Sequence, residues 1–140
     1  MGDKMHTTNY YNTFIEIAED SNAVAGIAPQ PKGSNKTIAE IQFELIAKNP
    51  YKYSSDDVLF QVYAARNDIA KTEQKTERDK FFAKGQPCFR ASPLTKQYGF
   101  GLHANNEGKI AIYGVETDKY EQFVANPDIK KVKAMRSAKK

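Results

Sequence analysis

The residues with the widest chemical range in this sequence lie in one stretch, 88–103, which reads CFRASPLTKQYGFGLH. It holds the only cysteine of the chain, Cys88, together with Arg90, Lys96 and His103. A cysteine and a histidine within hydrogen-bonding distance can perform nucleophilic catalysis. An arginine or a lysine instead binds carboxylate or phosphate groups. The stretch therefore suggests two classes of function, a small enzyme or a binding site for an anion.

Alternation of side chains predicts that residues 97–103 form a strand with one face in the core. The opposite face carries Gly99, Gly101 and His103, and a hairpin through residues 104–109 would bring Tyr113 beside them. Glycine inside a strand indicates that another backbone, a helix or a ligand approaches closely. A helix that covers the two glycines is the plainer interpretation, and a groove that they floor for a ligand or partner is the alternative on which the binding hypothesis rests.

The segment 88–92 is also expected to be a strand, which would place Arg90 on the side of His103. The hypothesis that follows is a binding or interaction module whose groove accepts a small anionic ligand. Its binding residues would be Arg90, Lys96, Gly99, Gly101, His103 and Tyr113. The alternatives that stay open are a structural ion pair between Arg90 and Glu16, and a small enzyme that uses Cys88, Arg90 and His103.

No motif in the sequence predicts a cofactor or a metal ion. The stretch 92–101 lacks the glycine pattern and the Lys-Ser/Thr pair of a phosphate loop. The two histidines, His6 and His103, lack the spacing of metal ligands. The acidic pair Asp56 and Asp57 follows two serines, which is typical of the first turn of a helix.

Hydrophobic periodicity and helix caps predict the elements that must position these side chains. We expect strands at 12–18, 88–92, 97–103 and 109–115, and helices at 37–49, 54–67, 75–85 and 117–126. Residues 20–36, which carry several prolines and glycines, form a long loop whose role the pattern does not reveal. The order predicts an α+β fold, a mostly antiparallel sheet of about four to five strands with three to four helices packed on one side.

Length and charge indicate one domain over residues 1–140, with residues 1–5 as an extension. The basic tail, residues 129–140, holds six of the 21 basic residues and none of the 17 acidic ones. A nucleic acid would meet this tail first, although a solvated terminus is the plainer interpretation. We expect no membrane association and a cytoplasmic location, because no long apolar stretch is present and Cys88 has no disulfide partner.

Four motifs resemble those of a family of small bacterial proteins that is known only as a domain of unknown function. They read HTTNYYNTFIEIAED, NPYKYSSDDVLF, RASPLTKQYGFGLH and VKAMRS, and the resemblance extends from Met5 to about Arg136. It implies a single-domain bacterial protein of the cytoplasm. It implies no activity, substrate or cofactor.

Overall fold

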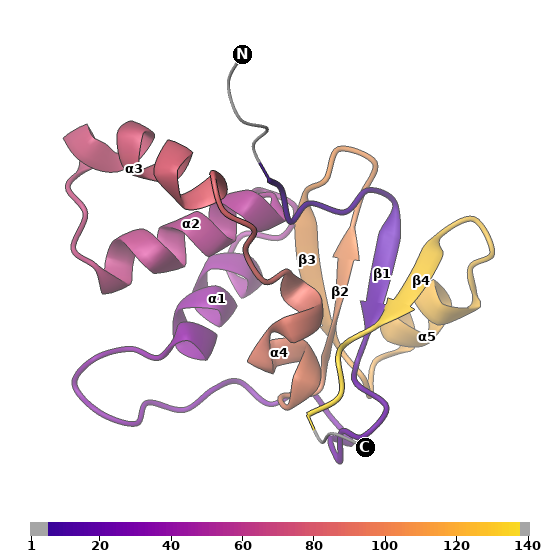
Figure 1. Cartoon of the computed structure of the whole chain (residues 1–140). Helices are drawn as coiled ribbons and strands as arrows, with labels where there is room; N and C mark the ends of the chain where they lie inside the picture. Colours follow the sequence, from indigo (N-terminus) through magenta and orange to yellow (C-terminus); the bar gives the residue numbers. More distant parts are fainter. Residues whose placement is uncertain (1–5, 138–140) are drawn as a thin grey trace.

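A four-stranded sheet forms the centre of the computed structural model, which describes residues 6–137 (Figure 1). Its strands are β1 (Thr13–Glu16), β2 (Phe100–Ala104), β3 (Ile110–Gly114) and β4 (Lys130–Lys133), in the order β3-β2-β1-β4. The β1–β2 and β2–β3 pairs are antiparallel, whereas β4 runs parallel to β1. The predicted α+β class is confirmed, and the sheet is mixed with mainly antiparallel pairing. The predicted extension, residues 1–5, lies outside the described residues.

Three of the helices begin where the sequence predicts. They are α1 (Ile38–Ala47), α2 (Ser55–Arg66) and α5 (Asp118–Ala125), capped by Thr37, Ser54 and Thr117. The caps of α1 and α2 are complete capping boxes. The side chain of the cap accepts a hydrogen bond from the backbone N–H of the third helical residue, whose side chain accepts one from the backbone N–H of the cap. The remaining helices are the 3-10 turn η1 (Lys71–Glu73), α3 (Gln74–Phe82), the 3-10 turn η2 (Phe89–Ala91) and α4 (Pro93–Lys96). Within residues 6–137, no helix is long and apolar enough to cross a membrane.

Helices cover both faces of the sheet, so the expectation that they pack on one side is wrong (Figure 1). Neighbouring side chains of a strand point to opposite faces, and Phe14 and Ile15 of β1 are both fully buried. Ile15 packs into the main core with α1, α2 and α4. Phe14 packs beneath α5, against Tyr120 and Phe123. Two buried faces require two covering layers, which is why α5 occupies the side opposite to the other helices.

The predicted strand at 88–92 is wrong, because this segment forms η2 and leads directly into α4. Ser92 caps α4 with its hydroxyl, which accepts a hydrogen bond from the backbone N–H of Leu94, and Pro93 fixes the first helical position. The Thr95 hydroxyl donates to the carbonyl of Phe89 at 2.6 Å and ties the two turns together. Local hydrogen bonding therefore outweighs the β-like alternation of these five residues.

The basic tail is not a separate appendage over residues 129–137. Ile129 is buried beneath α5, and β4 pairs with β1 along its whole length. Lys133 and Arg136 form ion pairs with Glu19. Residues 138–140 lie outside the described part of the chain. The strand β4, at the edge of the sheet, has exposed residues at both ends and half-buried residues between them, so it lacks the alternation that would predict a strand from the sequence.

The first turn of α2 holds two acidic residues with different roles. Asp57 completes the capping box and pairs with Arg78 at 3.0 Å, and these bonds lower the pKa of its carboxyl group despite its burial. Asp56 is buried and accepts hydrogen bonds from Thr7 and from both the N–H and the hydroxyl of Thr8. The predicted helix start is therefore present, and Asp56 in addition anchors the N-terminal segment to α2.

Candidate functional site

The two glycines of the predicted groove are both covered. A side chain at Gly101 would meet the rings of Phe14 and Tyr120, so α5 and β1 occupy the space above this position. Gly99 has a left-handed backbone with φ of 83° and packs against the carbonyl of Ala25 in the long loop. The plainer interpretation, a covering helix, holds for Gly101, whereas Gly99 admits the backbone of the long loop. No groove floor forms at Gly99 and Gly101.

The cationic side chains of the predicted site also lie apart. The Arg90 Nε donates to the backbone carbonyl of Lys133 at 2.6 Å, which joins η2 to the edge strand β4. Lys96 lines a hollow beside the long loop, with Asp20 and Ser21. His103 lies on the α5 face of the sheet, where its ring stacks on Phe123. The structure thus separates Arg90 and Lys96 from His103.

The structure does bring His103 and Tyr113 together, through a tyrosine that sequence reasoning did not select. The hydroxyl of Tyr51 lies 2.8 Å from the Nδ1 atom of His103 and 2.8 Å from the hydroxyl of Tyr113. The register of the hairpin sets His103 beside Ala111 and places Tyr113 opposite Gly101. Tyr51 itself has a left-handed backbone with φ of 60°, which is uncommon for a residue with a large side chain.

The pKa shifts of Tyr51 and His103 within their cluster with Tyr113 favour neutral side chains, which is typical of a structural hydrogen-bonded link. Burial lowers the pKa of His103, with a further contribution from Lys119, so the neutral imidazole is favoured as a hydrogen-bonding partner. Burial and the bond to Tyr113 raise the pKa of Tyr51, which keeps its phenol protonated. The cluster holds the turn before α2 against the sheet, and its hydroxyl groups bond to each other.

An apolar pocket lies on the other side of the sheet, within the helical layer. It has a volume of about 310 Å³ and is formed by α1, α2, the end of α3 and the segment that leads into η2 and α4. Most of its wall is apolar, with Leu59, Val62, Phe81 and Pro87 among the lining residues. Pockets that bind small molecules combine such apolar walls with a few polar groups, at volumes of roughly 300–1,000 Å³.

Gln42, like Ser92, is a polar residue in the buried part of the pocket wall. Its side chain is only 3% exposed, and its Oε1 accepts a hydrogen bond of 2.6 Å from the Ser92 hydroxyl. Its Nε2 group makes no hydrogen bond to any residue between 6 and 137. This nitrogen keeps some solvent-accessible surface, and Gln42 lines the pocket. Two N–H donors are therefore available to a bound molecule.

Sequence reasoning missed Gln42, although a signal was present. Gln42 lies four residues after Ile38 and four residues before Ile46, on the apolar stripe of α1. A glutamine on such a stripe is an exception to the pattern, because an amide is costly to bury unless it is hydrogen-bonded. Its partner, Ser92, is fifty residues further along the chain.

Cys88 lines the same pocket, far from the histidine with which a catalytic pair was considered. Its Sγ lies 3.2 Å from the hydroxyl of Tyr10. Burial raises the pKa of Tyr10 to about 12, so the phenol keeps its proton and can donate it to the sulfur. His103, by contrast, contacts Tyr51 and Phe123 on the α5 face. The proposed Cys88–His103 pair does not form.

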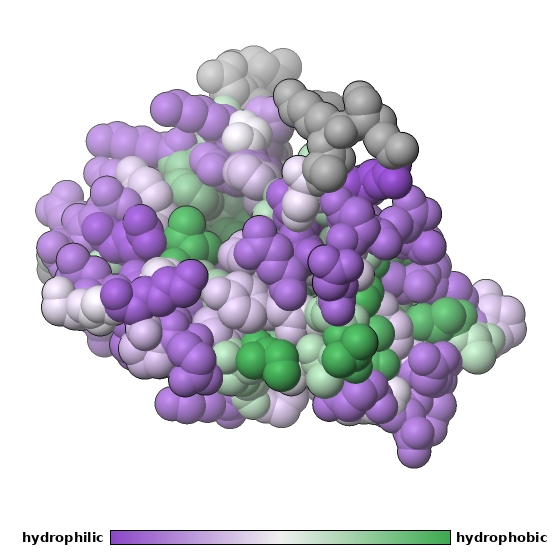
Figure 2. Space-filling model, turned by 90° about the horizontal axis from the view of Figure 1, so that it is seen from below, coloured by the Kyte–Doolittle hydropathy of each residue, from purple (hydrophilic) through white to green (hydrophobic). Residues whose placement is uncertain are grey.

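The remaining candidate chemistry is limited in the part of the chain that the structure describes. No group of three or more histidine, cysteine, aspartate or glutamate side chains is arranged to hold a metal ion there. Apolar side chains exposed on the lower face lie in separate patches within a largely hydrophilic surface (Figure 2). The pocket with Gln42 and Cys88 is therefore the candidate functional site.

Comparison with known proteins places the chain in a family without assigning an activity. The model of a family described as "Family of unknown function (DUF6157)" matches residues 5–140, and the chain belongs to this family. Neither a curated protein nor a solved structure matches the chain.

Proposed function

We propose that this member of the DUF6157 family is a binding module that takes a compact, mostly apolar molecule into the pocket between α1, α2 and η2. The observation that carries the proposal is the amide of Gln42, which is almost fully buried in an apolar wall and has two donors without a protein partner. A ligand with a carbonyl or another acceptor oxygen would take the place of solvent at this amide, and a hydrogen bond of this kind contributes about 1 kcal/mol.

The size of the pocket sets the size of the ligand. An apolar cavity of roughly 150 Å³ accommodates benzene. The volume here is about 310 Å³, which suits a molecule with one ring and one or two small substituents. Burial of its apolar surface would supply most of the affinity, at about 25 cal/mol for each Å² removed from water. Gln42 would supply orientation and selectivity.

The other two functions considered from the sequence have less support. An enzyme that uses Cys88, Arg90 and His103 would need these side chains near one another, but each bonds to a different part of the fold. Nucleic-acid association through the tail would rest on its basic side chains. Several of these contact the protein, since Lys131 donates to the carbonyl of Asn126 and Lys133 pairs with Glu19.

A bacterial cytoplasmic setting belongs to the same proposal. It is supported by the free thiol of Cys88, which lines the pocket and has no cysteine to pair with. A reducing compartment preserves such a thiol.

Two simple aromatic probes test the proposal. Acetophenone has a carbonyl acceptor, whereas ethylbenzene has a similar shape and no acceptor. We expect acetophenone to bind the wild-type protein about fivefold more tightly, because a hydrogen bond contributes about 1 kcal/mol. Isothermal titration calorimetry or chemical-shift titration measures both affinities. Equal affinities for the two probes, or no binding of either, would contradict the proposal.

Three variants locate the binding. Gln42→Leu removes the amide and keeps a side chain of similar volume, so it should abolish the preference for acetophenone while ethylbenzene still binds. Ala91→Leu adds bulk to the pocket wall and should weaken both probes at least about tenfold. Ala83→Leu is the matched control, because Ala83 is exposed and does not line the pocket. If Ala83→Leu weakens binding as strongly as Ala91→Leu, the probes bind elsewhere.

A further inference from the structure

We propose that the pocket selects carboxylic acids, with the carboxylate held at the pocket mouth by Arg66 and the acceptor oxygen of the ligand held in the interior by Gln42. This inference rests on the proposed function and names the ligand class. Arg66 is the only ionised side chain among the described lining residues, and no aspartate or glutamate lines the pocket. The wall therefore carries one positive charge that no acidic side chain in it neutralises.

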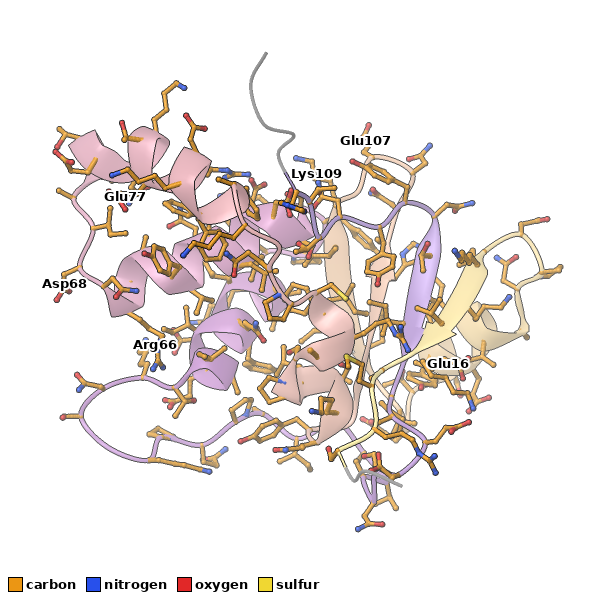
Figure 3. The ribbon with its side chains drawn as sticks, viewed as in Figure 1. Glu16, Arg66, Asp68, Glu77, Glu107 and Lys109 are labelled. Atoms are coloured by element: carbon orange, nitrogen blue, oxygen red, sulfur yellow. The ribbon has the colours of Figure 1, made fainter. Side chains whose placement is uncertain are left out.

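Arg66 is available to a ligand. It is exposed at the last position of α2, and it has no ion pair within 4.0 Å among the residues that the structure describes. In Figure 3 its side chain lies beside α1, whereas Asp68 lies at the outer edge of the molecule. A guanidinium group binds a carboxylate through two parallel N–H donors. Arg66 can therefore accept an anionic group without first releasing a partner.

The acids that share a second hollow with Arg66 form no ion pair with it in the described part of the chain. Arg66 also lines a second, polar hollow, which it shares with Glu44 and Asp68. Glu44 is paired with Lys36 at 2.6 Å, and this bond lowers the pKa of the Glu44 carboxyl group. Asp68 remains as a negative charge in this second hollow. Its presence should weaken the binding of an anion slightly. Removal of Asp68 should therefore raise the affinity for an anion, whereas removal of Arg66 should lower it.

The depths of the two polar groups fix the orientation of the ligand. A carboxylate in the buried part of the wall would lose its hydration and meet only the neutral amide of Gln42, which is unfavourable. At the mouth it keeps part of its hydration and meets a positive charge. A neutral acceptor such as a ketone or a hydroxyl is well matched to Gln42, which is 3% exposed. The ligand class is thus a compact apolar or aromatic acid with a neutral oxygen at its opposite end.

The test compares 4-acetylbenzoate with the neutral, nearly isosteric 4-acetylbenzamide, by calorimetry at low ionic strength. We expect the wild-type protein to bind the acid up to about fivefold more tightly, as an ion pair at an exposed position allows. The preference should fall at high salt, because salt screens exposed charges. Arg66→Gln should abolish the preference and leave the affinity for the amide unchanged.

Two further variants serve as controls. Lys71→Gln removes an exposed cation that does not line the pocket, and it should retain the preference for the acid. Asp68→Asn removes the opposing charge, and it should raise the affinity for the acid up to about twofold without changing that for the amide. Equal binding of acid and amide to the wild-type protein, or a preference that survives Arg66→Gln, would overturn this inference. If acetophenone still binds more tightly than ethylbenzene in that case, the proposed function stands; if no probe binds, both are overturned.

Discussion

The clearest test of the observed packing is the substitution Gly101→Ala. The added methyl group would lie 2.6 Å from the Cε2 atom of Tyr120 and still nearer to the ring of Phe14. Neither ring can move easily. Phe14 is fully buried and stacked on Phe123, and the Tyr120 hydroxyl accepts a hydrogen bond of 2.9 Å from the backbone of Ile17. The methyl group must therefore displace α5 from the sheet.

Overpacking of this kind costs about 1–3 kcal/mol. Because two constrained rings oppose the methyl group, we expect a loss in the upper part of that range, about 2–3 kcal/mol. For a chain of this size the melting temperature should fall by roughly 10 °C. Urea unfolding followed by circular dichroism measures the free energy of unfolding, and thermal unfolding measures the melting temperature.

Gly33→Ala is the matched control for this substitution. Gly33 is exposed in the long loop, and an added methyl group would meet no atom within 4 Å. We expect a change in unfolding free energy within about 0.5 kcal/mol. If Gly101→Ala were as mild as this control, α5 would not cover the glycine, and the open groove considered from the sequence would again be an option.

Three further outcomes follow from the structure. Ligands of the pocket should slow the alkylation of Cys88 by iodoacetamide, because this thiol lines the pocket wall. If the alkylation rate were unchanged at saturating acetophenone, the ligand would bind elsewhere. Asp56→Ala should lower the unfolding free energy by about 2 kcal/mol in urea titrations, because the N–H and hydroxyl of Thr8 lose a buried acceptor. A loss below about 0.5 kcal/mol, which is typical of a surface substitution, would contradict that anchor. The pKa of His103 is lower in the folded protein than in the unfolded chain. The unfolded chain therefore binds more protons as the pH falls below about 6.5. The contribution of neutral His103 to the free energy of unfolding is complete above that pH and declines as the pH falls. His103→Gln should reduce the decline, and an identical pH profile of the variant in urea unfolding would refute the assignment.

The helices were predictable because their start signals are local. The capping box of Thr37 and Glu40 and the cap of Ser54 depend on residues three positions apart, so the sequence alone specifies them. The hairpin of β2 and β3 was predictable for a similar reason, since alternation and Gly108 set its register. The alternating pattern failed at η2, where the cap of Ser92 and the bond from Thr95 to Phe89 give a helical turn.

The candidate site was not predictable in the same way. The sequence singled out Cys88, which does line the pocket, but it paired this residue with His103 on the opposite face of the sheet. Tyr51 reaches His103 across 52 residues, and Gln42 reaches Ser92 across 50. No local pattern encodes such contacts, because they depend on how separate elements pack.

The sequence by itself therefore determined the elements whose signals lie within a few residues, namely the capped helices, the hairpin and the side of β2 that faces the main core. Tertiary packing alone decided which layer covers the second face of the sheet, and so whether Gly101 meets a ligand or a ring. It also placed Gln42 and Arg66 on one cavity. The physical reason is that caps and alternation are set by the geometry of neighbouring residues, whereas a cavity exists only where elements distant in the chain fail to fill the space between them.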